Sequence, residues 1–162
     1  MEWSEVLENE TLQNLPFKIE LNEWGNIVMS PASNVHGAIQ IAIGGLLLNR
    51  LNKGERVVSE CSVKTSKGVK VADVAWLSAD FVATNGMGTP YEVSPELCIE
   101  ILSPSNSDAE MAQKRDTYFS KGAKEVWTCN LEGEMRFFNH RGEAERSGLF
   151  PDFPSMVELP GA

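Results

Sequence analysis

The sequence predicts an α/β fold in which helices pack on a mixed central β-sheet. Strand-like and helical segments follow one another in the order hairpin, helix, hairpin, strand, helix, hairpin. The second helix connects two strands and is long enough for a right-handed parallel crossover. The chain has 162 residues, of which 42% are hydrophobic, and contains no linker rich in Pro, Gly or Ser. We therefore expect residues 1–162 to form a single domain.

The first half of the chain is expected to fold as a hairpin, a helix and a second hairpin. Each predicted strand is a short run rich in apolar residues, and a glycine-containing turn separates the two members of each pair. These runs span residues 17–21, 27–29, 57–64 and 69–77. Ser33 is a natural N-cap, and apolar side chains then recur at helical spacing as far as Leu51, before Gly54 ends the helix.

The second half is expected to form a buried strand, a helix and a third hairpin. Ser107 followed by Glu110 matches the capping box of a helix start, and Lys121 before Gly122 matches a helix end. The strands are predicted at residues 97–102, 125–131 and 135–138. Glycine and proline mark residues 78–95 as an irregular loop, and we expect the C-terminal residues, including 150–153, to pack as a surface tail.

The composition narrows the classes of protein to which this chain can belong. The longest run without a polar side chain, residues 41–48, is too short to span a membrane. The first residues lack the features of a secretory signal, so we expect a cytoplasmic protein. Cys61, Cys98 and Cys129 are far apart and odd in number, which predicts buried free thiols and argues against a structural zinc site.

The charge is acidic overall and basic in one segment. Fourteen basic residues against 23 acidic ones give a net charge of −9, which argues against a general affinity for phosphate backbones. Between residues 50 and 70, however, six lysines and arginines accompany only two glutamates. Two interpretations stay open: a solvated charged hairpin, which the pattern favours, and a nucleic-acid-binding surface that uses Lys64, Lys67 and Lys70.

Two acidic residues lie in strands whose neighbours on both sides are apolar. Asp73 is in the run 71–76, and Glu100 is in the run 97–102. A buried carboxylate needs a hydrogen-bonding, ionic or metal partner. The two acids therefore either meet near the strand ends and bind a divalent metal such as Mg²⁺, or pair separately with lysine or arginine. A glycosidase acid pair is a third, weaker interpretation.

Lys114 favours a shared site for the two acids. It lies three residues after Met111 and four before Tyr118, so the three side chains share the helical stripe expected to face the sheet. A lysine that points toward the sheet is able to meet both acids. Such a lysine more commonly covers the edge of the core with its alkyl stem, and this interpretation also stays open.

These residues carry a resemblance to a known family. From about residue 25 to residue 131 the chain resembles the Uma2 family, formerly a domain of unknown function, which is placed in the PD-(D/E)XK nuclease superfamily. The matching elements are Val71-Ala72-Asp73-Val74-Ala75, Leu97-Cys98-Ile99-Glu100-Ile101-Leu102-Ser103-Pro104-Ser105, Lys114, Tyr118, Gly122 and Glu125-Val126-Trp127, with Ser30-Pro31 and His36 upstream. The element from Glu100 to Ser105, with the Lys and Tyr after it, is the most specific.

The resemblance implies a restriction-endonuclease-like core with a metal-dependent phosphodiesterase site. In such a site Asp73 and Glu100 bind Mg²⁺, with Mn²⁺ as the alternative ion, and the backbone carbonyl of Ile101 adds a ligand. A lysine then helps to activate water or stabilises developing charge on the phosphate. His36 and Gln113 are weaker, accessory candidates. DNA is the expected partner.

Two positions depart from the family pattern. The proline expected before the aspartate is Ala72, and the lysine expected two residues after the glutamate is Leu102. We predict that Lys114 takes the role of that lysine in a Mg²⁺-dependent endonuclease. The alternative is a catalytically inactive nuclease-fold protein that binds nucleic acid or another protein. A homodimer would allow so small a nuclease to cut both DNA strands, but no residue pattern specifies one.

Overall fold

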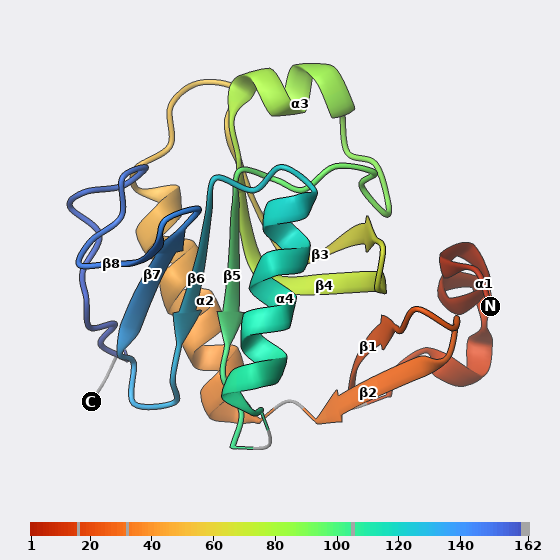
Figure 1. Cartoon of the computed structure of the whole chain (residues 1–162). Helices are drawn as coiled ribbons and strands as arrows, with labels where there is room; N and C mark the ends of the chain where they lie inside the picture. The colour runs from red at the N-terminus through yellow and green to blue at the C-terminus, as the bar shows by residue number, and fades with distance from the viewer. Residues whose placement is uncertain (16, 32, 105, 160–162) are drawn as a thin grey trace.

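A six-stranded sheet forms the centre of the computed structural model, which describes residues 1–15, 17–31, 33–104 and 106–159 (Figure 1). Its strands follow one another across the sheet in chain order: β3 (Arg56–Thr65), β4 (Gly68–Leu77), β5 (Leu97–Ile101), β6 (Glu125–Cys129), β7 (Met135–Asn139) and β8 (Gly142–Ala144). All neighbouring strands are antiparallel except β5 and β6, which are parallel. The predicted mixed sheet is confirmed.

Two helices cover the opposite faces of this sheet (Figure 1). Helix α4 (Asp108–Ser120) makes the parallel crossover from β5 to β6, and α2 (Asn34–Leu48) packs on the other face. Both begin at the predicted N-caps, because Ser33 Oγ accepts from the backbone N–H of His36 and Ser107 Oγ accepts from that of Glu110. The caps satisfy backbone donors that a helix start otherwise leaves free. Ser105, at the end of the Ser-Pro-Ser element, lies outside the described residues.

Alternation along the central strands divides the core into two layers. On β4, Val74 and Trp76 belong to the layer that α2 covers, where Ile43 is fully buried. Ala75, between them, belongs to the other layer, together with Tyr118 of α4. Because both faces are covered, a polar side chain on β4 or β5 enters the protein interior.

A second, two-stranded sheet stands beside the central one (Figure 1). It consists of β1 (Phe17–Leu21) and β2 (Ile27–Pro31), and α1 (Trp3–Glu8) and a 3₁₀ turn at Glu10–Leu12 precede it. A separate apolar cluster joins this hairpin and α1 to β4; its buried members are Trp3, Val6, Leu21, Val69 and Val71. The cluster fixes β1 beside β4.

The expected loop at residues 78–95 contains a helix, α3 (Ala79–Asn85). Ser78 caps it by accepting from the backbone N–H of Phe81 at 3.0 Å, and Gly86 ends it with φ +61°. The helix has seven residues and buries only Phe81. So short a helix lacks the apolar periodicity on which sequence prediction depends.

The C-terminal residues belong to the core, so the expectation of a surface tail is wrong. Phe150 and Phe153 are buried, with ring centroids 6.1 and 4.7 Å from that of Trp127. The buried carboxylate of Glu125 anchors the preceding loop, because it accepts from Trp127 Nε1, Ser147 Oγ and two backbone N–H groups. The two rings complete the layer on the α2 side of the sheet, a long-range contact that their local sequence does not reveal.

The three cysteines lie in β3, β5 and β6 as buried free thiols, as predicted. Burial raises the pKa of the Cys61 thiol to about 12, so this side chain is protonated and unreactive at neutral pH. Among the described residues, no helix combines the length and the hydropathy that crossing a bilayer requires.

Candidate functional site

Asp73 and Glu100 face each other where β4 and β5 separate. The last residues that these strands pair are Val74 and Ile99, so Asp73 and Glu100 occupy the next opposite positions. The Asp73 carboxylate fills the gap, because its Oδ2 accepts from the backbone N–H of Ile101 at 2.6 Å. Asp73 is 1% exposed and Glu100 is 4% exposed. The sheet thus brings together two buried carboxylates that are 27 positions apart in the chain.

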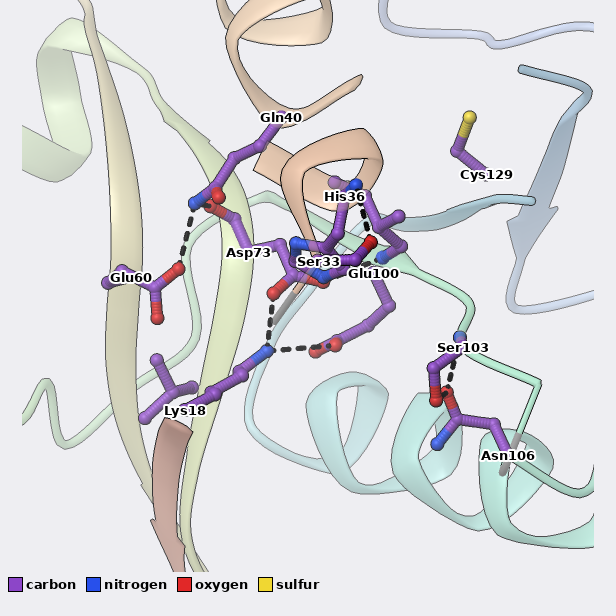
Figure 2. Close-up of polar contacts among 12 residues, drawn as sticks. Lys18, Ser33, His36, Gln40, Glu60, Asp73, Glu100, Ser103, Asn106 and Cys129 are labelled. Carbon is purple, nitrogen blue, oxygen red and sulfur yellow. Dashed lines mark hydrogen bonds and ion pairs between the residues drawn. The ribbon is translucent and has the colours of Figure 1, made fainter. Parts of the chain in front are cut away.

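The pairing of β3 with β4 is also interrupted at Asp73. Glu60 lies between the paired residues Ser59 and Cys61 and has a φ of +52°, in the left-handed region that disfavours a non-glycine residue. Gln40 of α2 bridges the interruption, because its Nε2 donates to the Asp73 carbonyl and to Glu60 Oε1, both at 2.8 Å (Figure 2). The amide of Gln40 therefore holds the backbone of Asp73 in place.

Lysines from two other elements neutralise the acids. Lys18 of β1 places its Nζ 2.7 Å from Asp73 Oδ1 and 3.3 Å from Glu100 Oε2 (Figure 2). Lys114 of α4 places its Nζ 2.9 Å from Glu100 Oε2 and 2.7 Å from Glu20 Oε1. Lys70 lies 3.8 Å from Glu20 Oε2. We call these three acids and three lysines the ion-pair network.

Further groups contact the carboxylates of these acids. The buried hydroxyl of Tyr118 donates to Glu100 Oε1 at 2.7 Å. The backbone N–H of Val71 donates to Glu20 Oε1 at 2.9 Å, which links β1 to β4. His36, near the start of α2, has its Nε2 3.5 Å from Asp73 Oδ2. Each carboxylate in the ion-pair network therefore contacts both a lysine and a hydrogen-bond donor.

Burial and ion pairing shift the pKa values in this network. Burial favours a raised pKa for Asp73, but the contact with His36, the charge of Lys18 and the Ile101 N–H outweigh it and hold the pKa well below the ordinary value. Burial dominates for Glu100 and raises its pKa, although Lys114 and Lys18 oppose this shift. Asp73 is thus the more strongly stabilised anion of the pair.

A polar cleft of about 120 Å³ opens beside the network, between the β1–β2 hairpin and α4. The residues predicted as the centre of the site, Asp73, Glu100 and Lys114, all line it. So do the other predicted residues Ile101, His36, Gln113, Lys67 and Lys70. Glu110, expected only in a helix cap, also contributes to the lining.

Lys64 is not with the other predicted residues. Lys70 pairs with Val63 across the β3–β4 hairpin, so Lys64, the next residue along β3, points to the opposite face. Each of the three predicted basic residues also contacts a glutamate: Lys64 contacts Glu92, Lys67 contacts Glu23, and Lys70 contacts Glu20. The local positive excess of the sequence is therefore largely offset in the folded protein.

Sequence reasoning missed Lys18 and Glu20. Both lie on the polar side of β1, which alternation alone assigns to solvent. In the structure this side faces the two buried acids, and the side chains of Lys18 and Glu20 are only 12% and 13% exposed. The sequence signal that pointed to them was the pair of opposite charges two residues apart on one strand, because such a pair suits packing against another charged surface.

The two acids fit a hard divalent cation. Among the residues that the structure describes, no three His, Cys, Asp or Glu side chains converge as a metal-binding group. Mg²⁺ needs fewer protein ligands, because it usually retains several waters and binds one or two carboxylates. Asp73 and Glu100 each direct one oxygen to the same cation, the Lys18 ammonium. Their donor chemistry and their convergence thus suit Mg²⁺ or Mn²⁺.

We predict that the Asp73→Asn substitution lowers the free energy of unfolding by about 3 kcal/mol at neutral pH, because it leaves Lys18 without its closest partner. The pKa of Asp73 is lower in the folded chain than in the unfolded chain. Its contribution is therefore complete above about pH 5 and is lost as the pH falls through the folded pKa. Urea unfolding at neutral pH and at about pH 3 should show a smaller difference between the two proteins in acid.

The matched control for this prediction is Asp80→Asn, which removes an exposed carboxylate in the first turn of α3. It should change the free energy of unfolding little at either pH. An Asp73→Asn variant as stable as the wild type at neutral pH would contradict the prediction, because repulsion from Glu100 would then fully offset the attraction to Lys18.

Comparison with known proteins agrees with this fold. The structure resembles the crystal structure of "a putative nuclease belonging to DUF820" from Anabaena variabilis ATCC 29413, with a TM-score of 0.66 and 19% sequence identity over 78% of this chain and 74% of that one. This likeness shows a shared fold. No curated protein gave a significant match. A family model described as "Uma2: Putative restriction endonuclease" matches residues 3–155. Because this match spans nearly the whole chain, the protein belongs to the Uma2 family.

Proposed function

We propose that the protein is a metal-dependent endonuclease that hydrolyses DNA phosphodiester bonds. One observation carries the proposal: Asp73 and Glu100 face each other across a strand gap and direct an oxygen each to one cation beside a polar cleft. Asp73, Glu100 and the carbonyl oxygen of Ile101 would hold Mg²⁺ or Mn²⁺. A metal bound there would polarise the phosphate and lower the pKa of a bound water.

The residues around the acids have separate roles in this proposal. The N–H of Ile101 holds Asp73 as an anion, and Tyr118 orients Glu100 by donating to its Oε1. Lys114 lines the cleft with its ammonium against Glu100 and would stabilise negative charge on the phosphate. Leu102 stands in place of the expected strand lysine, so in this proposal Lys114 of α4 would supply the positive charge.

A second candidate function is a binding module with the nuclease fold and no catalytic activity. The complete ion pairing of Asp73 and Glu100 with lysines favours it, because a structural network needs no metal. The two functions differ in one requirement. Cleavage depends on a divalent metal, whereas binding by such a module does not.

We predict that Asp73→Asn and Glu100→Gln each abolish Mg²⁺-dependent cleavage, because a neutral amide is a poor ligand for Mg²⁺. The measurement is nicking and linearisation of supercoiled plasmid with Mg²⁺, with Mn²⁺ and with EDTA. Asp80→Asn and Glu132→Gln, which alter exposed acids, serve as controls and should cleave like the wild type. A wild-type protein that leaves DNA intact with both metals would support the binding module instead.

We predict that Lys114→Met lowers the cleavage rate at saturating Mg²⁺ by about 10², as expected for loss of one electrostatic stabiliser. Metal affinity should not fall, because the substitution removes a cation and leaves both acids in place. Adding Leu102→Lys to this variant should restore part of the rate. Leu102 follows the last residue of β5, but its N–H continues the pairing with β6 by donating to the Cys129 carbonyl, and residues two apart in extended backbone share a face.

Lys124→Met is the matched control for Lys114, because it removes an exposed lysine that does not line the cleft. Its cleavage rate should equal that of the wild type. If Lys114→Met cleaves as fast as this control, Lys114 only covers the core edge and has no part in the reaction.

We predict that Lys67 and Lys70 contribute to DNA binding and that Lys64 does not. The first two line the cleft, whereas Lys64 points to the opposite face of the hairpin. Lys67→Gln with Lys70→Gln should flatten the dependence of log Kd on log salt by up to about 0.9 per lost phosphate contact. Fluorescence anisotropy with labelled duplex DNA in EDTA measures this slope. An equal effect of Lys64→Gln would move the DNA surface away from the cleft.

A further inference from the structure

Lys18 occupies the position at which the two acids converge. Its ammonium lies 2.7 Å from Asp73 Oδ1 and 3.3 Å from Glu100 Oε2, and Figure 2 shows it between the two carboxylates. It comes from the β1–β2 hairpin, which is separate from the central sheet that carries the acids. Of the lysines in the ion-pair network, Lys18 contacts both acids, while Lys114 contacts only Glu100 of the two.

The same two oxygens are the ones that a metal would need. Asp73 Oδ2 is engaged by the Ile101 N–H, and Glu100 Oε1 is engaged by the Tyr118 hydroxyl. Asp73 Oδ1 and Glu100 Oε2 are the oxygens turned toward the shared position, and both contact the Lys18 ammonium. Lys114 also donates to Glu100 Oε2, at 2.9 Å, but does not contact Asp73, so Lys18 alone of the two bridges the acids. A divalent cation held by these two oxygens and the ammonium cannot occupy that position together, because their volumes overlap and their charges repel.

We infer that Lys18 is a built-in competitor for the divalent cation, so that the acid pair holds either the lysine ammonium or the metal. The inference rests on the metal-binding part of the proposed function. With the lysine in place, the buried carboxylates are neutralised and the protein is stable without metal. Metal binding then requires the ammonium to leave, and the apparent affinity for metal falls by the fraction of molecules in which the site is open.

The side chain of Lys18, rather than the hairpin, makes this exchange. The backbone of β1 is fixed, because Glu20 accepts from the Val71 N–H and the buried Leu21 side chain clusters with Val69 and Val71 of β4. The Lys18 side chain has a flexible four-carbon stem, and the cleft that it lines is open to solvent. Rotation about the bonds of the stem moves the ammonium into the cleft while the strand stays in register.

Calorimetric titration of Mg²⁺ and Mn²⁺ into the whole chain tests the exchange. Lys18→Met should bind either ion at least about tenfold more tightly than the wild type. This is the gain expected if the Lys18 ammonium occupies the acid pair in about 90% of wild-type molecules. Lys124→Met makes the same change in net charge at an exposed site and should bind like the wild type. Adding Asp73→Asn to Lys18→Met should abolish the gain and so locate it at the acid pair.

Thermal unfolding supplies a second measurement. In EDTA, Lys18→Met should melt below the wild type, because Asp73 loses its closest cation. Saturating Mg²⁺ should raise its Tm by more than it raises that of the wild type, since tighter binding stabilises the folded state more. Lys18→Gln, which retains an N–H donor for Asp73, takes the place of the Met variant if that variant does not fold.

The outcomes separate this inference from the proposed function. Equal metal affinity in the wild type and Lys18→Met would overturn the competition by Lys18 and leave the metal site standing. Absence of binding in both proteins would overturn the competition and the proposed metal dependence together. Metal binding by Lys18→Met and not by the wild type would support both the competition and the metal site. It would mean that the Lys18 ammonium occupies the acid pair in nearly all wild-type molecules.

Discussion

The burial of two carboxylates opposite each other, where β4 and β5 separate, is the constraint on which the rest of the site depends. Asp73 and Glu100 lie just beyond the last paired residues of these strands, and both are buried. Two like charges at such a position are unfavourable unless cations accompany them. Strand β5 offers no such cation, because it contains no basic residue and Leu102, two residues after Glu100, is apolar. The compensating charge therefore comes from other elements, with Lys18 on β1 and Lys114 on α4.

The ion pairs with these lysines also connect the elements that carry them. Lys18 ties the β1–β2 hairpin to the central sheet, and Lys114 ties α4 both to Glu100 and to Glu20 on that hairpin. Helix α2 contributes Gln40, whose Nε2 donates to the backbone carbonyl of Asp73. The ion-pair network thus connects separate layers of the structure and also lines the cleft. Substitutions within it are expected to change stability and function together.

Local patterns predict the central sheet except for β8, its two long helices and the centre of the candidate site. Asp73 and Glu100 stand out because their strands are apolar on both faces, and Lys114 stands out because it shares a stripe with core residues. Lys18 escaped prediction because strand alternation distinguishes two faces without showing whether solvent or a second sheet covers the polar one. Phe150 was misplaced for a related reason, since its partners are brought to it only by the tertiary fold. What remained beyond prediction was the identity of partners from distant segments.

The most direct test of this account is anomalous scattering from crystals of the protein grown in excess Mn²⁺. We expect an anomalous peak between the carboxylates of Asp73 and Glu100, with the Lys18 ammonium displaced from both acids into the cleft. A crystal in which Lys18 still bridges the two carboxylates, with no anomalous peak between them, would contradict it.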